Sequence, residues 1–316
     1  MPLRWNGGAS CLYQSKLENR FLSLFFSPSE YNLIMPSLVP YEAVDYLVIG
    51  HLAHDLTPQG SRLGGTASYS ALTARALGLR VGVVTSWGNE IPLDSLNGIQ
   101  VRGIEAEHST TFENIYTLSG RIQHLHHVAP DLKLEDIPPV WRRAPIVHIG
   151  PIAQEAKSLV SAGLSSSLLG LTPQGWLRTW DGNHRVHPCG WPESAEALPL
   201  AGAVVLSVED VGGDEEQIET MAVNCRVLAV TEGPSGARVY WHGDLRRFHA
   251  PKMDEVDATG AGDIFAAAFF WRLHITRDPW AAGRFATHLA SYSVARRGLE
   301  GIPTQQEIRN CLVEVL

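Results

Sequence analysis

A glycine turn with a carboxylate beside it carries the clearest chemical signal in this chain. Residues 257–263 read Asp-Ala-Thr-Gly-Ala-Gly-Asp, and the apolar run Ile-Phe-Ala-Ala-Ala-Phe-Phe follows at once. Gly260 and Gly262 have no Cβ and can take positive φ angles, so a ligand can approach their backbone closely. The apolar run predicts a helix, whose first N–H groups lack intrahelical partners and whose dipole is positive at that end. The turn is therefore suited to hold a phosphate group.

Asp263 falls in the first turn of that predicted helix. A carboxylate there can accept the proton of an attacking hydroxyl while the turn stabilises the charge that develops on a phosphoryl group. By itself the pattern also fits an ordinary strand-to-helix turn, in which Asp263 interacts only with the helix dipole. The rest of the chain decides between these two interpretations.

Composition narrows the class of protein. The chain has 316 residues, with 25 Lys and Arg against 33 Asp and Glu, so its formal net charge is 25 − 33 = −8. This balance disfavours partners such as nucleic acid or an anionic membrane surface. The four cysteines lie far apart and form no Cys-x-x-Cys pair, so we expect a cytoplasmic protein without a zinc or redox motif. No apolar run approaches the roughly 18–20 residues of a membrane span.

Short apolar strands alternate with helices from residue 44 onward. The predicted strands cover 44–50, 81–85, 146–150, 167–171, 203–207 and 227–231, and the predicted helices cover 66–77, 152–161, 214–223, 263–273, 280–296 and 304–315. This alternation predicts a mainly parallel sheet covered on both faces, with ligands beyond the carboxyl ends of its strands. Two stretches, about 51–65 and 105–128, break the alternation and predict a small β-lid. We interpret residues 1–43 as a loosely ordered or mis-started N-terminal extension.

Several motifs in a fixed order resemble the ribokinase (PfkB) family of carbohydrate kinases over about residues 44–316. The segment DATGAGDIFAAAFF is similar to the carboxyl-terminal signature of that family, and RLGGTASYSALTARALG, from Arg62 to Gly78, is similar to its Gly-Gly segment. The first strand ends in GHLAHD, where Asp55 matches an aspartate that binds substrate hydroxyls in the family. The segment TEGPSG, Thr231–Gly236, looks like the turn that contacts the nucleotide.

The resemblance implies a ribokinase-like three-layer α/β/α sandwich with a small β-lid, within which residues 44–316 form the kinase domain. It also implies transfer of a phosphoryl group from ATP, with Mg²⁺, to a hydroxyl of a small polyol, which is a sugar, a cyclitol or a nucleoside. In that reaction Asp263 would be the general base, and the turn of Gly260, Ala261 and Gly262 would be the anion hole. The chain has no Gly-x-x-x-x-Gly-Lys-Ser/Thr motif, so a P-loop does not hold the phosphate.

The resemblance assigns further residues by their positions in the family motifs. It places Asp55, Gly64 and Gly65 at the substrate, Thr231, Gly233 and Gly236 at the nucleotide, and Asp257 and Thr259 at a monovalent cation such as K⁺. Asp257 has an equally simple interpretation as a residue that caps or orients the glycine turn. A homodimer formed through the lid is common for this architecture, and we carry it as a possible assembly.

The chain departs from the family pattern at two places that bear on function. Tyr69 stands where many members have an asparagine, so the substrate site differs from that of a standard ribokinase. The Asn-x-x-Glu motif tied to magnesium is replaced by Ser207-Val208-Glu209-Asp210, which leaves Asp210 and Glu209 as candidate magnesium ligands. These changes keep open an alternative: a catalytically weak, ribokinase-like protein that binds a ligand or regulates.

Three other patterns have competing interpretations. The histidines at 124, 126 and 127 could bind a transition metal, but polar positions on a lid strand explain them better. Asp55 with nearby histidines could be a catalytic dyad, or it could accept hydrogen bonds from substrate hydroxyls. Trp176 and Trp180, at i and i+4, suit packing on a helix face, and Arg178 between them stays open. A dinucleotide-binding oxidoreductase is disfavoured, because Gly50 is followed by His-Leu-Ala-His-Asp rather than by a glycine-rich fingerprint.

Overall fold

A nine-stranded sheet forms the centre of the computed structural model, which describes residues 40–58, 60–90, 92–117 and 120–314. The strand order is β15-β14-β13-β12-β9-β8-β1-β4-β5, and every pairing is parallel except β13 with β14 and β14 with β15. The strands are β1 (Tyr46–Ile49), β4 (Val81–Trp87), β5 (Gln100–Glu105), β8 (Ile146–Ile149), β9 (Leu168–Leu171), β12 (Ala203–Ser207), β13 (Val227–Thr231), β14 (Ala237–Trp241) and β15 (Asp244–Phe248). The carboxyl ends of the parallel strands therefore meet at one edge, where ligands of such sheets gather.

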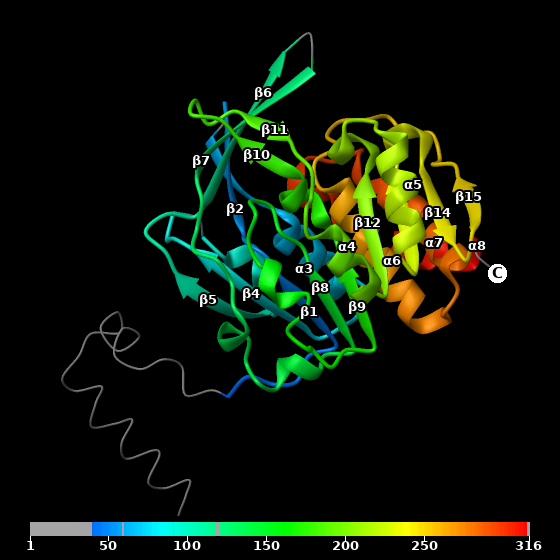
Figure 1. Ribbon diagram of the computed structural model, residues 1–316, viewed down its shortest axis with the longest axis horizontal. Helices are drawn as coiled ribbons and strands as arrows, with labels where there is room; N and C mark the ends of the chain where they lie inside the picture. Colours follow the sequence, from blue (N-terminus) through cyan, green and yellow to red (C-terminus); the bar gives the residue numbers. More distant parts are fainter. Residues whose placement is uncertain (1–39, 59, 91, 118–119, 315–316) are drawn as a thin grey trace, which may run out of the picture. The chain divides into compact units, whose positions relative to one another are not determined.

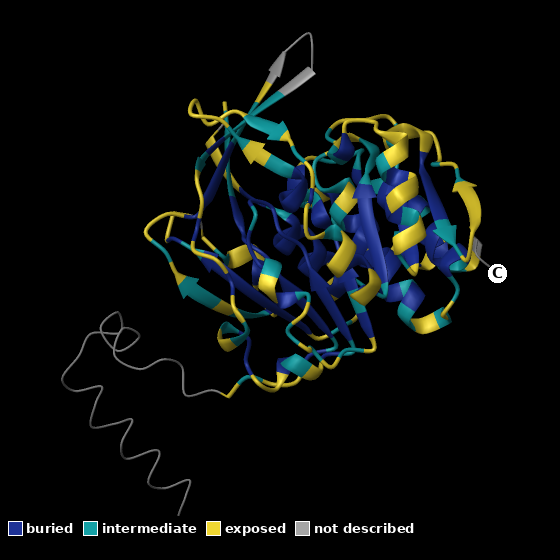
Figure 2. Ribbon diagram, viewed as in Figure 1, coloured by how far each residue is buried: buried dark blue, intermediate teal, exposed yellow. Residues whose placement is uncertain are grey.

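Helices cover both faces of this sheet (Figure 1). One face carries α3 (Thr66–Ala76), α6 (Ala261–Thr276), α7 (Pro279–Ser293) and α8 (Gln305–Glu314), and the other carries α4 (Ser194–Ala197) and α5 (Glu215–Asn224). Helix α6 is apolar nearly all round because it packs between the sheet, α3 and α7, with Ile264, Phe269 and Phe270 fully buried. Figure 2 shows the inner strands and α6 buried, whereas the edge strand β15 is exposed.

A second sheet of four strands, in the order β3-β2-β6-β7, stands beside the first. Its strands are β2 (Ala53–Thr57), β3 (Gly60–Gly64), β6 (Thr110–Thr117) and β7 (Gly120–His127). A two-stranded sheet of β10 (Arg178–Trp180) and β11 (Val186–Pro188) adjoins it through the bridge between His124 and Arg185. The predicted fold class, a mainly parallel sheet between helices with a small additional sheet, is confirmed.

Two local predictions are wrong. Residues 152–161 form no α-helix and contain only a 3₁₀ turn at Lys157–Leu159. The reason is the carboxylate of Glu155, which accepts the backbone N–H groups of Ile152, Ala153 and His51 and so holds the loop in a non-helical path. The two tryptophans do not share a helix face, because Trp176 lies in a 3₁₀ turn and packs on Trp191, whereas Trp180 lies in β10.

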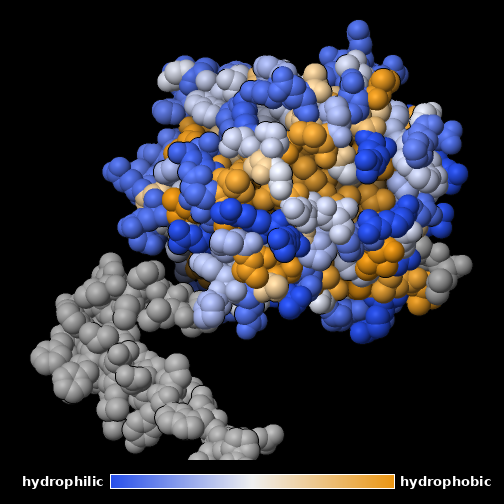
Figure 3. All heavy atoms as spheres, turned by 60° about the horizontal axis from the view of Figure 1, so that its bottom comes forward, coloured by the Kyte–Doolittle hydropathy of each residue, from blue (hydrophilic) through white to orange (hydrophobic). Residues whose placement is uncertain are grey.

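Across the described residues, no helix combines the length and the apolar character that crossing a membrane would require. Figure 3 shows one face of the molecule, on which several hydrophobic patches lie among hydrophilic side chains. The predicted extension falls almost wholly on residues 1–39, which lie outside the described part of the chain. Its character stays a prediction.

Candidate functional site

The glycine turn opens helix α6 as predicted. Gly260 is the N-cap of the helix and takes a left-handed conformation with φ of 80°, which only glycine adopts without strain. The N–H of Ala261 donates to the Ala258 carbonyl at 3.2 Å, so this N–H is engaged within the turn. A Cβ on Gly262 would meet no heavy atom within 4 Å, so the backbone there is open to a ligand. The open side of the turn is therefore at Gly262, where the helix dipole is positive.

Asp263 lies half-buried in the first turn of α6. The pKa of its carboxyl group is raised to about 6, mainly by burial and in addition by the negative charges of Asp210 and Asp55. A hydrogen bond with Thr66 and the positive charge of Arg178 act in the opposite direction. A carboxylate with a pKa near neutrality is suited to general base catalysis, because it is ionised at neutral pH and still accepts a proton readily.

Tyr69, on α3, packs its ring against the glycine turn. A Cβ on Gly260 would lie 2.2 Å from Tyr69 Cδ1, so residue 260 must be glycine for this contact as well as for its φ angle. Burial raises the pKa of the Tyr69 phenol well above its usual range, and the charges of Asp55, Asp263 and Asp257 raise it too. Tyr69 therefore lies near both Asp55, the predicted substrate-binding residue, and Asp263, the predicted base.

Asp257 accepts hydrogen bonds from residues on three segments, including the side chain of Thr259. Its Oδ1 accepts the Thr259 N–H at 2.9 Å, and its Oδ2 accepts the Gly298 N–H at 3.0 Å. Arg62, from β3, donates to Oδ2 at 3.5 Å. Burial raises the pKa of Asp257, but these hydrogen bonds and the charge of Arg62 outweigh burial and leave the pKa below its usual value. The structure thus places Asp257 as an organiser of the loop that precedes the turn.

The Gly-Gly segment makes room for Asp55. A Cβ on Gly64 would lie 1.9 Å from Asp55 Oδ2, although in the pairing of β2 with β3 Gly64 faces Ala53 and Asp55 faces Arg62. Gly65 caps α3 with φ of 84°, and a Cβ there would lie 3.0 Å from the backbone of Ala53. Gly64 therefore leaves room for the Asp55 carboxylate, whose charge acts on Asp263.

Asp210 and Glu209 follow β12 but differ in surroundings. Asp210 Oδ2 accepts the Ser207 N–H at 2.8 Å, and its Oδ1 accepts the side-chain amide of Gln174 at 3.0 Å. Glu209 is exposed, and its backbone takes part in the capping turn: its N–H donates to Ser207 Oγ and its carbonyl accepts the Gly212 N–H at 3.1 Å. Of the two carboxylates, Asp210 is the one whose charge raises the pKa of Asp263.

The segment Thr231–Gly236 forms a tight turn at the carboxyl end of β13. The Glu232 N–H donates to the Gly236 carbonyl at 2.8 Å, and Gly233 and Gly236 both have positive φ angles of 55° and 100°. A Cβ on Gly236 would lie 2.0 Å from the Phe248 carbonyl oxygen, so the turn packs tightly on the end of β15. Thr231 Oγ1 lies 3.5 Å from the Leu206 carbonyl of the neighbouring strand.

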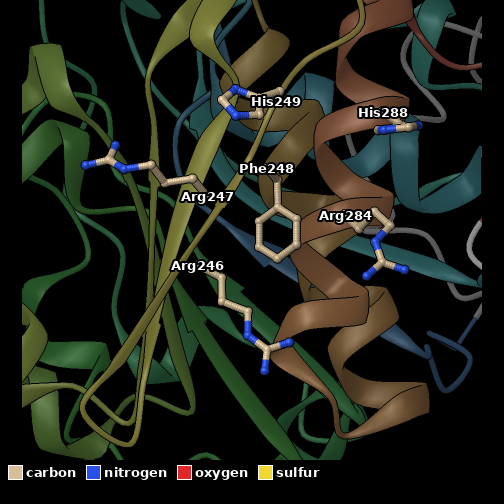
Figure 4. Close-up of a pocket in the computed structure, with 6 residues that line it drawn as sticks. All are labelled: Arg246, Arg247, Phe248, His249, Arg284 and His288. Atoms are coloured by element: carbon tan, nitrogen blue, oxygen red, sulfur yellow. The ribbon is translucent and has the colours of Figure 1, made fainter.

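A basic pocket of about 520 Å³ adjoins this turn. It is lined by Arg246, Arg247, Phe248, His249, Arg284 and His288, from β15, the residue after it and α7. Figure 4 shows Phe248 pointing toward α7 while Arg246 and Arg247 extend in different directions. Arg246 lies over the Trp280 ring at 4.4 Å, and Arg247 pairs with Glu232 at 3.2 Å. The pocket is separate from the carboxylates around Asp263 and has the opposite charge.

In the described part of the chain, His51 and His126 are engaged with partners other than Asp55 or a set of metal ligands. His51 is buried and its two ring nitrogens contact Thr110 Oγ1 and the Pro130 carbonyl, so the alternative that pairs it with Asp55 is not supported. His126 instead pairs with Glu113 across the lid strands at 2.9 Å. Within the described ranges, no three His, Cys, Asp or Glu side chains are placed to hold a metal ion.

Sequence reasoning missed Thr66 and the role of Arg62, and it left Arg178 open. Thr66 directly follows the glycine pair and starts α3, and a hydroxyl at a helix start was the only available signal for it. Arg178 reaches the site because β10 follows a 3₁₀ turn after β9, which periodicity does not reveal. Arg62 stands two residues before Gly64, but only strand pairing brings it near residue 257.

Comparisons with known proteins agree with this architecture. A family model described as pfkB family carbohydrate kinase matches residues 195–305, which include the glycine turn. A cytidine kinase of Thermococcus kodakarensis is 27% identical over 250 residues, which are 72% of this chain and 87% of that protein. A probable chloroplastic fructokinase-6 of Arabidopsis thaliana is 26% identical over 196 residues, which are 55% of this chain and 51% of that protein. The chain thus spans most of the former protein and about half of the latter.

Solved structures share the fold. A pyrophosphate-dependent kinase in the ribokinase family, complexed with a pyrophosphate analogue and myo-inositol, superposes with a TM-score of 0.66 at 19% identity. The match covers 84% of this chain and 99% of that structure. At this level of identity the likeness establishes the three-layer fold and its additional sheet, and the chemistry of the site has to be argued from the residues themselves.

Proposed function

We propose, from the premise that the chain belongs to the PfkB family of carbohydrate kinases, that it phosphorylates a hydroxyl of a small polyol. The observation that carries the proposal is the position of Asp263, with a pKa of about 6, in the first turn of α6 beside the open backbone of Gly262. A base and an anion-binding turn on one helix end are what transfer of a phosphoryl group to a hydroxyl requires.

The acceptor would lie between the Asp55 and Asp263 carboxylates. Asp55, held by Gly64, accepts hydrogen bonds from hydroxyls of the substrate and orients it. Asp263 takes the proton of the attacking hydroxyl as the new O–P bond forms and the bond to the donor breaks. The hydrogen bond from Thr66 and the charge of Arg178 hold the Asp263 carboxylate in place during this step. The acceleration of the reaction comes mainly from positioning and electrostatics, as in phosphoryl transfer generally.

The turn of Gly260, Ala261 and Gly262 would stabilise the transferred group. The Gly262 backbone is open, and the positive end of the α6 dipole lies there, so negative charge on the phosphoryl oxygens is favoured. The Ala261 N–H already serves the turn itself, and its part is to keep Gly262 in place. Because the open backbone at Gly262 binds the phosphoryl oxygens, a lysine next to the turn is not required to bind them.

The donor would be ATP, bound over the turn of Thr231, Gly233 and Gly236. The basic pocket beside this turn supports a polyanionic donor, because three arginines and two histidines line it. Mg²⁺ neutralises donor phosphates in such reactions and is held by one or two carboxylates together with phosphate oxygens and water. Asp210 fits that requirement, since each of its oxygens has a free lone pair beyond the hydrogen bonds described, whereas exposed Glu209 would be at most an outer partner.

The acceptor class is a nucleoside, a sugar or a cyclitol, the three classes that the names of the relatives contain. The test is a turnover screen of the full chain against pentoses, hexoses, inositols and nucleosides, with ATP and with pyrophosphate as donors. Asp263→Asn serves as the matched variant, because it keeps the shape of the side chain and removes the base. We expect turnover of one acceptor class with ATP, and a fall of about 10²–10⁴-fold in the variant.

Two outcomes would contradict the proposal. Wild-type turnover by Asp263→Asn would remove Asp263 as the base, and turnover only with pyrophosphate would replace the donor. Calorimetry separates the remaining alternative. Binding of a polyol without phosphoryl transfer under any metal condition would identify a ligand-binding or regulatory protein built on the kinase fold.

A further inference from the structure

The loop before the glycine turn receives its positive charge from an arginine on the second sheet. Arg62 Nη1 lies 3.5 Å from Asp257 Oδ2, although 195 residues separate the two in the chain. A Cβ on Gly298 would lie 3.5 Å from the same Nη1 and 3.8 Å from the Tyr69 hydroxyl. Arg62, Gly298 and Tyr69 therefore surround the Asp257 carboxylate and the turn behind it.

Donors from three segments already occupy the two oxygens of Asp257, and the Thr259 side chain is one of them. Thr259 N–H binds Oδ1, and Gly298 N–H and Arg62 bind Oδ2, while a carboxylate offers about four lone-pair sites in all. The guanidinium carries a permanent positive charge, and a second cation within a few ångströms would be repelled by it. The residues present therefore do not fit the monovalent cation that Asp257 and Thr259 would hold in the family resemblance.

We propose that the Arg62 guanidinium supplies the charge that a monovalent cation would otherwise supply at Asp257, so that this chain works without a specific monovalent cation. The inference rests on the proposed kinase activity. Arg62 acts through Asp257 and the turn at Gly260, so it is a positioning residue rather than a group that touches the reacting atoms. Because β3 also pairs with the strand of Asp55, one arginine links the recognition groups with the phosphate-binding turn.

The pair is unsuited to a purely stabilising role. The side chain of Arg62 is 43% exposed and that of Asp257 is 15% exposed, and ion pairs so close to solvent contribute little to folding. Removing the Arg62 guanidinium should therefore leave the fold intact and alter how Asp257 positions the turn at Gly260. The ion pair of Arg80 with Asp45 serves as a control. Its charged atoms lie 2.7 Å apart, and the side chains are 62% and 32% exposed. The two residues lie at the amino ends of β4 and β1, at the opposite edge of the sheet.

The experiment compares wild type, Arg62→Met, Arg62→Lys and the control Arg80→Met in chloride salts of K⁺, Na⁺, Li⁺ and choline at constant ionic strength. Turnover is measured with the acceptor found in the screen. Thermal unfolding of each protein without substrate is recorded in the same salts, and this readout needs no activity. Circular dichroism confirms that each variant is folded.

We expect wild-type kcat to agree within about twofold across the four salts. Arg62→Met should lose about tenfold or more in kcat with little change in KM, and K⁺ should restore part of the loss. Arg62→Lys should retain most of the turnover, and Arg80→Met should behave as wild type. In the unfolding measurements, K⁺ should raise the Tm of Arg62→Met specifically, by about 2 °C, and should not do so for wild type.

A K⁺-specific rise in the turnover or Tm of wild type would overturn the inference. So would an Arg62→Met protein with wild-type kcat in all four salts. If wild type phosphorylates nothing in any salt, the proposed function fails, while the unfolding measurements still decide whether Arg62 excludes a cation from Asp257. The two failures are therefore distinguishable.

Discussion

The ring of Tyr69 packs against Gly260, so closely that a Cβ on residue 260 would come within 2.2 Å of the ring. A residue of α3 thus supports the turn that opens α6, nearly two hundred positions later in the chain. Tyr69 is therefore a structural support for the glycine turn, and the charges of Asp55, Asp257 and Asp263 act on its hydroxyl.

Gly260→Ala should destabilise the protein and abolish most turnover. The substitution imposes a φ angle of 80° on alanine and drives its methyl group into Tyr69, with an expected loss of about 2–4 kcal/mol in the free energy of unfolding. Gly163→Ala is the matched control, because Gly163 also has a positive φ, of 71°, but open space around it. In denaturant unfolding, Gly163→Ala should lose only about 1 kcal/mol in the free energy of unfolding. An equal loss in the two variants would mean that the contact with Tyr69 is unimportant.

Tyr69→Phe should separate the role of the ring, which packs on Gly260, from that of the hydroxyl, which would contact the acceptor. The variant keeps the ring against Gly260, so its thermal unfolding should resemble that of wild type. Loss of the hydroxyl should raise KM for the acceptor about 2–10-fold, the effect of one hydrogen bond, with a smaller change in kcat. Tyr69→Asn removes the ring as well and should lower the free energy of unfolding by about 2–4 kcal/mol. A Tyr69→Phe enzyme with unchanged kinetics would leave the hydroxyl without a role at the substrate.

The rate should depend on pH through the ionisation of Asp263. The base works only as a carboxylate, and its pKa is raised to about 6. We therefore expect kcat to rise tenfold per pH unit below about pH 6 and to level off above it. The measurement is kcat from pH 4.5 to 8 at saturating acceptor and donor, with the protein shown to be folded at each pH. A profile that is flat down to pH 4.5 would exclude Asp263 as the titrating base.

The stability of the protein should also report on Asp263. Its pKa rises on folding from 3.8 to about 6, so the folded state binds the proton more tightly than the unfolded state does. This contribution is complete below about pH 4 and is lost as the pH rises through 6. Asp263→Asn cannot ionise, so it should be more stable than wild type by about 1–2 kcal/mol at pH 7, and equally stable near pH 4. Denaturant unfolding at both pH values is the check, and a less stable variant at pH 7 would contradict the direction of the pKa change.

The regular elements were largely predictable because they depend on local pattern. The apolar runs at 203–207 and 227–231 became β12 and β13, and the glycine turn begins α6 within two residues of the predicted helix start. The prediction failed at residues 152–161, where the run of residues fits a helix but Glu155 takes the backbone N–H groups that the loop offers. A buried carboxylate that binds main-chain groups leaves no periodic trace in a sequence.

By itself the sequence determined the chemical groups of this protein: a carboxylate after a glycine turn, a second carboxylate after the first strand, and glycines where the backbone must take positive φ. These follow from residue type and spacing within a few positions. Only the tertiary structure decided which groups act on one another. Arg62 reaches Asp257, Tyr69 supports Gly260, and the charges of Asp210 and Asp55 raise the pKa of Asp263. Each of these relationships joins residues more than fifty positions apart, and electrostatic and packing energies depend on distance in space rather than along the chain.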